Sequence, residues 1–193
     1  MADCVPRLVI LSVLPMSTVT RDSFGPLVAY LVPGATVLWG LSFFSTTLQS
    51  WFILTRPDAP SLGGFLYLTV AAVAAGMTVN AIRWAVIDTV HKMTGLQSAP
   101  MDFSRLGQNV EAFSLLIEIH YNHYQYHANM AVATVIAYAC YRIQLDSLQT
   151  WGWADLTVVI LEIVFIAMSR DTLRKYHSRG EQVLSGRHSR SGK

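Results

Sequence analysis

The stretch EIHYNHYQYHANM, residues 118–130, gathers most of the side chains in this sequence that could do chemistry. His120, His123 and His127 are three and four residues apart, so a helix would carry their imidazoles on one face. Imidazole is the commonest side-chain ligand of transition metals, and a membrane-bound metal enzyme is therefore one hypothesis. Histidines seven positions apart are separated by about 10 Å along a helix axis, so such a site would need further ligands from other segments.

The spacing of these histidines resembles one histidine box of the membrane fatty-acid hydroxylases and desaturases, which implies a metal centre on this face. Those enzymes use several such boxes. The other histidines, His91, His177 and His188, stand alone in the sequence, so they form no second box. We expect no metal and no other cofactor, and keep the three-histidine metal site as the alternative.

A second pattern lies near the C-terminus, where Arg170, Asp171 and His177 resemble the arginine, polar residue and histidine signature of HEPN ribonucleases. Some members of that superfamily are small membrane proteins that oligomerise in bacterial immunity. The resemblance covers eight residues of 193 and implies nuclease roles for Arg170 and His177. The chain lacks GxSxG, Walker A, GxGxxG and HExxH motifs, so we expect no enzymatic activity.

The histidine face has a polar counterpart on the other side of the same helix. At about 100° per residue, five side chains fall within an arc of about 60°: Glu111, Glu118, Asn122, Gln125 and Asn129. Polar groups facing lipid near the bilayer centre cost about 2.5 to 3.5 kcal/mol each. We therefore expect both polar faces to be covered by neighbouring helices, another subunit or water.

The preceding apolar segment supplies a partner for the carboxylates. Arg83, together with Asn80, is expected near the same membrane boundary, where Arg83 would face Glu118 or Glu111. Asp88 and His91 are three residues apart and could join the same layer. A charge pair of this kind is either structural or part of a conducting or switching element.

The composition favours a membrane protein. The chain is 52% hydrophobic and only 13% charged, and its mean hydropathy is +0.38, whereas soluble domains average about 25% charged residues. Cys4 and Cys140 do not suggest a disulfide framework. The lipid bilayer is therefore the first expected partner.

Four segments could form transmembrane helices of about 20 mostly apolar residues. They are Pro26 to as far as Leu54 with a kink at Pro33-Gly34, residues 64–87, about Val110–Leu145, and about Trp153–Met168. The Ala71/Ala75 and Ala72/Gly76 pairs of the second segment fit close helix packing. The fold class expected is all-α and polytopic, with four transmembrane helices and a long third helix that extends into the cytoplasm.

Charge sets the predicted orientation. With a cytoplasmic N-terminus, all of the 14 lysines and arginines except Arg56 and Arg142 fall on the inner side, a strong positive-inside bias. We expect a multi-pass protein of the cell (inner) membrane with both termini in the cytoplasm. The expected domains are an N-terminal segment 1–22, which is disordered or contains the true start at Met16, a four-helix domain 23–169, and a basic tail 170–193.

The tail reads as a short helix, residues 171–184, followed by a low-complexity basic end. The net charge is only +2, so anionic lipid headgroups are a better partner than nucleic acid. Two polar faces on one helix favour self-association. The function expected is a small homo-oligomeric channel or pore-like effector, in bacterial defence or stress response, lined by the Glu111 to Asn129 stripe. The alternatives are the metal enzyme and a non-catalytic membrane scaffold.

Overall fold

A computed structural model describes residues 16–52, 62–96, 103–145 and 151–185. Every regular element in these residues is a helix, which confirms the all-α prediction. The elements are α1 (Met16–Ser42), α2 (Thr46–Phe52), α3 (Leu62–Met93), the 3₁₀ turn η1 (Phe103–Gln108), α4 (Val110–Leu116), the π-helical turn η2 (Ile117–Tyr121), α5 (Asn122–Gln144) and α6 (Trp153–Ser185). The predictions for residues 1–15 and the basic end 186–193, as well as Arg56, lie outside the described residues.

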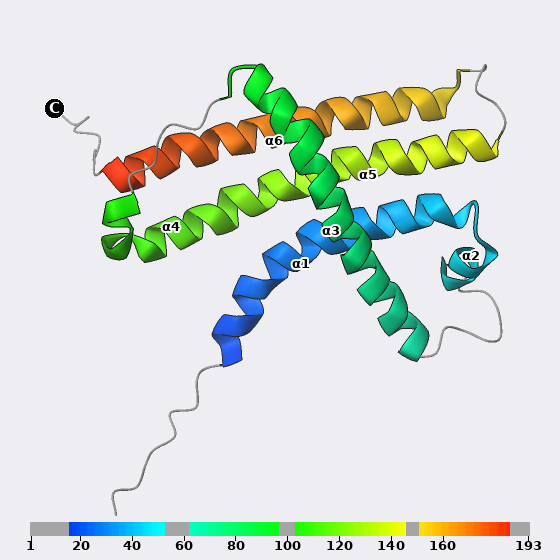
Figure 1. Cartoon of the computed structure of the whole chain (residues 1–193), viewed down its shortest axis with the longest axis horizontal. Helices are drawn as coiled ribbons and strands as arrows, with labels where there is room; N and C mark the ends of the chain where they lie inside the picture. Colours follow the sequence, from blue (N-terminus) through cyan, green and yellow to red (C-terminus); the bar gives the residue numbers. More distant parts are fainter. Residues whose placement is uncertain (1–15, 53–61, 97–102, 146–150, 186–193) are drawn as a thin grey trace, which may run out of the picture.

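Three long helices form a layer that the fourth crosses. Helix α5 lies between α1 and α6, and α3 runs obliquely over one face of the three (Figure 1). The arrangement is therefore a three-helix layer with a crossing helix, and its members are not all parallel. This geometry lets α3 contact α1, α5 and α6 at successive positions along its length.

Small residues permit the closest of these crossings. A Cβ atom at Gly34 of α1 would lie 1.7 Å from the carbonyl oxygen of Ala72, and one at Gly76 of α3 would lie 2.0 Å from that of Tyr30. The two backbones are thus in direct contact. The predicted Ala72/Gly76 packing pair is confirmed, and Val37, Val79 and Ala133 complete the core beside it.

The first apolar segment ends earlier than predicted. Helix α1 stops at Ser42 and does not continue to Leu54. A new short helix follows because the Ser45 side chain accepts a hydrogen bond from the Leu48 N–H at 3.4 Å, as an N-cap residue does. Helix α1 bends along its length in Figure 1, as expected with Pro26 and Pro33 in its sequence.

The predicted third helix is present but contains an irregularity. Helix α4, turn η2 and helix α5 follow without a break, and in η2 the N–H of Asn122 bonds to the carbonyl of Ile117, five residues earlier. This π-helical pairing inserts one extra residue, which rotates the residues before it by about 100° relative to those after it. Glu111 is therefore out of phase with Asn122, and the single continuous stripe that we predicted is wrong.

The predicted fourth span and tail helix are one helix. Helix α6 continues through Arg170 and reaches Ser185, 33 residues in all. The predicted boundary between residues 169 and 170 thus lies inside a helix. No glycine or proline interrupts the chain at that point, and Arg170 holds the helix there by donating hydrogen bonds to Thr94 at the end of α3.

One helix in the described part of the chain, Gly63–Met93 in α3, is long and apolar enough to cross a membrane. Leu27–Ser42 of α1 is a shorter apolar helix, and the apolar half of α6 carries Asp155 and Glu162. Membrane association is compatible with this finding, whereas the four-span topology remains a prediction.

Candidate functional site

The amide residues of the predicted stripe pack against α1. Asn129 is fully buried and its Nδ2 donates to the carbonyl oxygen of Ala29 at 3.0 Å. One turn earlier, the Nε2 of Gln125 donates to the Tyr30 hydroxyl at 3.4 Å. Asn122 lies against Gly25, where a Cβ would come within 2.9 Å of its Nδ2. In a single chain, this amide face is therefore a helix contact.

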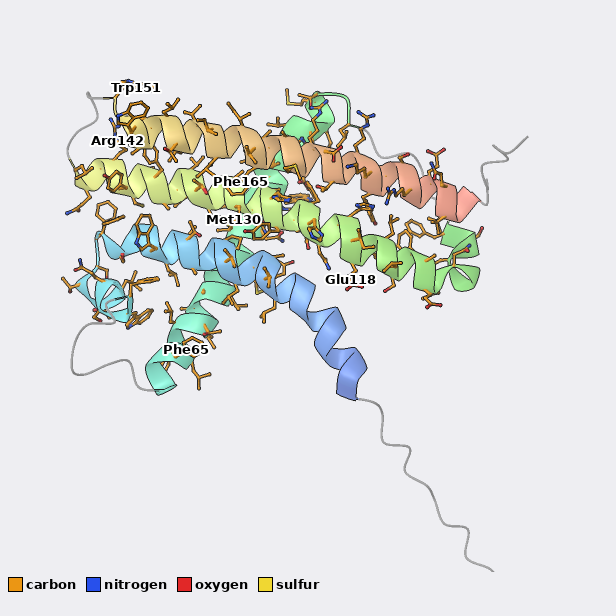
Figure 2. All side chains as sticks on the ribbon, turned by 180° about the vertical axis from the view of Figure 1, so that it is seen from behind. Phe65, Glu118, Met130, Arg142, Trp151 and Phe165 are labelled. Carbon is orange, nitrogen blue, oxygen red and sulfur yellow. The ribbon has the colours of Figure 1, made fainter. Side chains whose placement is uncertain are left out.

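The acidic residues of the stripe lie elsewhere. Glu111 lies in α4, before the π-helical turn, and is exposed. Glu118 lies in the turn and is half-buried. Figure 2 shows Glu118 toward the end of the layer opposite Arg142 and Trp151. We call the end that holds η2, the start of α5 and residues 170–184 of α6 the polar end of the layer.

Arg83 is buried, with only 3% of its surface exposed, and its partner differs from the predicted one. Its Nη1 lies 3.3 Å from the Oδ1 of Asp88 on the same helix. The Tyr124 hydroxyl donates to the same oxygen, and the guanidinium lies 5.1 Å from the centroid of the Tyr124 ring. The predicted pairing with Glu118 or Glu111 is wrong because α5 brings Tyr124 to this part of α3, whereas Glu118 lies in η2 and Glu111 in α4.

The other members of this layer lie close by. His91 is 2% exposed and its Nε2 is 2.8 Å from the Oγ of Ser169 on α6. Asn80 is half-buried, and its Oδ1 has no hydrogen-bond partner among the described residues. Asp88 thus joins Arg83 as predicted, while His91 connects α3 to α6.

The three histidines of the predicted metal site have three different environments. The Nη1 of Arg179 donates to the Nε2 of His120 at 2.7 Å. His123 is exposed, and the ring of His127 faces that of Phe165 with the centroids 6.3 Å apart. The described residues contain no group of three or more His, Cys, Asp or Glu side chains that could hold a metal ion.

The Arg179 contact determines the chemistry of His120. A guanidinium is always protonated and only donates, so the Nε2 of His120 must be an acceptor and the ring neutral. Burial of the ring lowers the pKa of His120 below its usual 6.5, and the positive charge of Arg179 lowers it further. His120 therefore serves as a neutral link between η2 and α6.

Arg170 and His177, the predicted nuclease pair, serve separate contacts. The Nη1 and Nη2 of Arg170 donate to the Oγ1 of Thr94 at 2.6 Å and to its carbonyl oxygen at 3.0 Å. His177 is half-buried, and this burial lowers its pKa. Seven residues of helix separate the two by about 10 Å along the axis, so no shared reaction site is formed by these two side chains alone.

The C-terminal half of α6 presents a basic surface at the polar end. Arg174, Lys175, Ser178, Arg179 and Gln182 line a cleft of about 230 Å³. Lys175 lies 2.5 Å from the exposed Asp171 carboxylate one turn earlier. The cleft therefore carries three basic side chains, Arg174, Lys175 and Arg179.

Two acidic residues were not among the predicted site residues. Asp155 begins α6 and accepts hydrogen bonds from Arg142, Tyr138 and the Gly152 N–H. Glu162 has a buried Oε1 without a partner among the described residues. The signals were present in the sequence, as opposite charges at facing ends of consecutive helices and as a lone carboxylate in an apolar run.

Comparisons with protein-family models, with curated proteins and with solved structures found no match for this chain.

Proposed function

We propose that this protein is a non-catalytic membrane scaffold whose helix α6 leaves the bilayer and presents a basic surface to anionic lipid headgroups. The observation that supports this proposal most is the change of exposed surface along α6. From Leu156 to Met168 eight large apolar side chains are between 40% and 62% exposed, while Val158 and Phe165 are half-buried. From Arg170 onward its exposed side chains are mostly charged or polar.

The apolar surface favours the bilayer as the solvent for half of the molecule. Exposed apolar side chains on α6 include Leu156, Val159, Ile160, Leu161, Ile163, Val164, Ile166 and Met168, and the outer face of α3 adds Phe65, Leu66, Tyr67, Val70, Met77, Trp84 and Val86. Patches of this extent mark membrane or protein contacts. In this proposal Leu27–Ser42, Gly63–Met93, residues 128–145 and residues 153–168 cross the membrane, and both termini lie in the cytoplasm.

The basic residues of α6 begin at the depth of the headgroups. Arg170 and Arg174 follow Met168 by about 3 and 9 Å along the helix axis, and a headgroup layer is about 5 to 8 Å thick. Each Lys or Arg near an anionic membrane surface contributes about 1 kcal/mol. The helix would thereby be held at the surface, with η2 and α4 beside it.

The covered polar faces favour a scaffold over a pore. Because α1 covers Gln125 and Asn129 and Arg179 of α6 contacts His120, these three side chains do not need a second subunit. The channel remains a second candidate, since Glu111 and Glu118 form no ion pair within the described ranges. Conductance of reconstituted vesicles that is lost in Glu118→Gln would support it.

The scaffold proposal is tested by hydrogen–deuterium exchange of residues 170–184 in the full chain, placed in nanodiscs of neutral lipid or of lipid containing phosphatidylglycerol. We expect slower exchange with the anionic lipid, and loss of this difference at high salt. Replacing Arg174 and Lys175 by serine removes about 2 kcal/mol of attraction and should abolish the difference. Gln182→Ser, on the same cleft, is the control and should retain it. Equal exchange in both lipids would contradict the proposal.

A further inference from the structure

Glu162 occupies an unusual environment for a carboxyl group. Its neighbours Leu161 and Ile163 are 40% and 62% exposed on the apolar half of α6, whereas its own Oε1 is buried without a hydrogen-bond partner among the described residues. An isolated carboxylate in such a place is strongly disfavoured, and the group takes up a proton instead. Glu162 as a whole is half-buried, so one of its carboxyl oxygens lies in a site that favours the protonated form.

The residues that follow Glu162 along α6 lead from it toward the polar end. Phe165 and Ser169 lie three and seven positions further on, so all three share one face of the helix. The Phe165 ring faces His127 of α5, with the centroids 6.3 Å apart. The Ser169 hydroxyl lies 2.8 Å from the Nε2 of His91 on α3. Figure 2 shows Phe165 in the middle of the layer, between Trp151 at one end and Glu118 toward the other.

The two histidines on this path each have an uncommitted nitrogen. The Nδ1 atoms of His127 and of His91 are buried and lack a hydrogen-bond partner in the described part of the chain. Buried polar atoms of this kind are usually satisfied by an internal water molecule. A neutral imidazole can accept a proton at one nitrogen and release one from the other. The packing of α3, α5 and α6 thus contains two imidazoles that are each able to carry a proton.

We propose that Glu162 is a reversible proton-binding site that exchanges its proton with the polar end of the layer through His127 and His91. Seven residues separate Glu162 from Ser169, about 10 Å along the axis, so the intermediate imidazole of His127 and bridging water are needed. The proton that leaves a Glu162 oxygen passes to water and His127, then to His91, and is released to solvent at the polar end. Each histidine returns to its neutral form, and no other atom changes its bonding.

This proposal is independent of the basic surface of α6. A protein that binds headgroups through Arg174 and Lys175 does not need a protonatable group at residue 162. Substitutions at those two basic residues should therefore leave the protonation of Glu162 unchanged, so either proposal can fail while the other stands.

Infrared spectroscopy of the full chain in neutral-lipid vesicles tests the proposal. The C=O stretching band of a protonated carboxyl should be present in the wild type and absent in Glu162→Gln. On transfer to D₂O, the band of the wild type should shift as the proton exchanges. In His127→Phe the exchange should be slower by at least about tenfold, the lower range for loss of a positioned proton carrier.

His123→Phe provides the matched control, because His123 lies one turn away on α5 and is exposed. It should exchange as fast as the wild type. His127→Gln keeps a polar side chain and removes the titratable ring, so its exchange should be slow like that of His127→Phe. It provides the test if His127→Phe does not fold. A spectrum unchanged by Glu162→Gln, or equal exchange rates in the wild type and both His127 variants, would overturn the proposal.

Discussion

At the scale of single residues, the contact between Arg179 and His120 joins the π-helical turn η2 to the C-terminal half of α6. The Nη1 of Arg179 donates to the Nε2 of His120 across 59 residues of sequence. Other charged or titratable groups near the ring are Lys175 and Asp171 of α6 and His123 of α5. The positive charges of Arg179 and Lys175 outweigh the negative charge of Asp171, so the site favours the neutral imidazole.

This contact predicts that stability falls in acid. The pKa of His120 is lower in the folded protein than the 6.5 of the unfolded chain. As the pH falls below 6.5, the imidazole therefore binds a proton more readily in the unfolded chain than in the folded protein. The stabilisation is fully present above about pH 6.5 and is lost as the pH falls toward the folded pKa. The melting temperature between pH 8 and pH 5 should fall more for the wild type than for His120→Gln. The variant His123→Gln should behave like the wild type, and an identical decline in all three would contradict the prediction.

At the scale of elements, the crossing of α1 and α3 depends on two glycines. Gly34 and Gly76 leave no room for a side chain, because the nearest atoms are carbonyl oxygens of the opposite helix. A methyl group there can be accommodated only if the helices separate. The oblique course of α3 over the layer in Figure 1 therefore requires glycine at both positions, because neither has space for a Cβ atom.

Gly76→Ala should destabilise the fold, since overpacking typically costs about 1–3 kcal/mol and the clash here is with backbone. Gly107→Ala is the matched control, because a Cβ at Gly107 meets nothing within 4 Å. Chemical unfolding in detergent micelles measures both. Equal stability of the two variants would show that the crossing does not have this geometry.

The sequence predicted the positions of the helices more accurately than the contacts between them. The second and third segments were predicted at 64–87 and about 110–145, close to α3 and to the α4–η2–α5 run. Hydrophobic runs mark such helices. The π-helical turn at Ile117–Tyr121 arises from a one-residue shift of backbone hydrogen bonds, for which side-chain periodicity gives no signal. The phase of Glu111 was therefore mispredicted.

The partners of the polar residues were harder to predict because they depend on how the helices are arranged. Residue types indicated that Arg83 would have an acidic partner, but the choice of Asp88 over Glu118 follows from the oblique path of α3, which brings Tyr124 to the guanidinium. Likewise, Asn129 needed a partner, and only the packed structure identifies the carbonyl of Ala29.

At the scale of the whole molecule, the polar faces that would drive self-association are partly covered within one chain. The amide face contacts α1, and His120 and His127 contact α6, whereas His123 is exposed. The homo-oligomer expected from the sequence remains a prediction, since Glu118 is half-buried and Glu111 and His123 are exposed. Association through the exposed apolar side of α3 would compete with lipid.

The scaffold proposal predicts a detergent-extracted particle that contains one chain of 21.4 kDa. Light scattering coupled to size-exclusion chromatography, corrected for bound detergent, measures this mass. A stable particle of several chains that dissociates in Glu118→Gln, but not in the exposed control His123→Gln, would instead favour the channel.

The uninterrupted course of α6 gives the molecule a mechanical property. Its 33 residues make a rod about 50 Å long, anchored near its middle where Ser169 contacts His91. If the rod pivots there by about 10°, its far end at Leu184 moves sideways by about 4 Å. If the half of α6 before Ser169 lies in the bilayer, as proposed above, a change in bilayer thickness that tilts it would also displace the basic half, together with the η2 turn that Arg179 contacts.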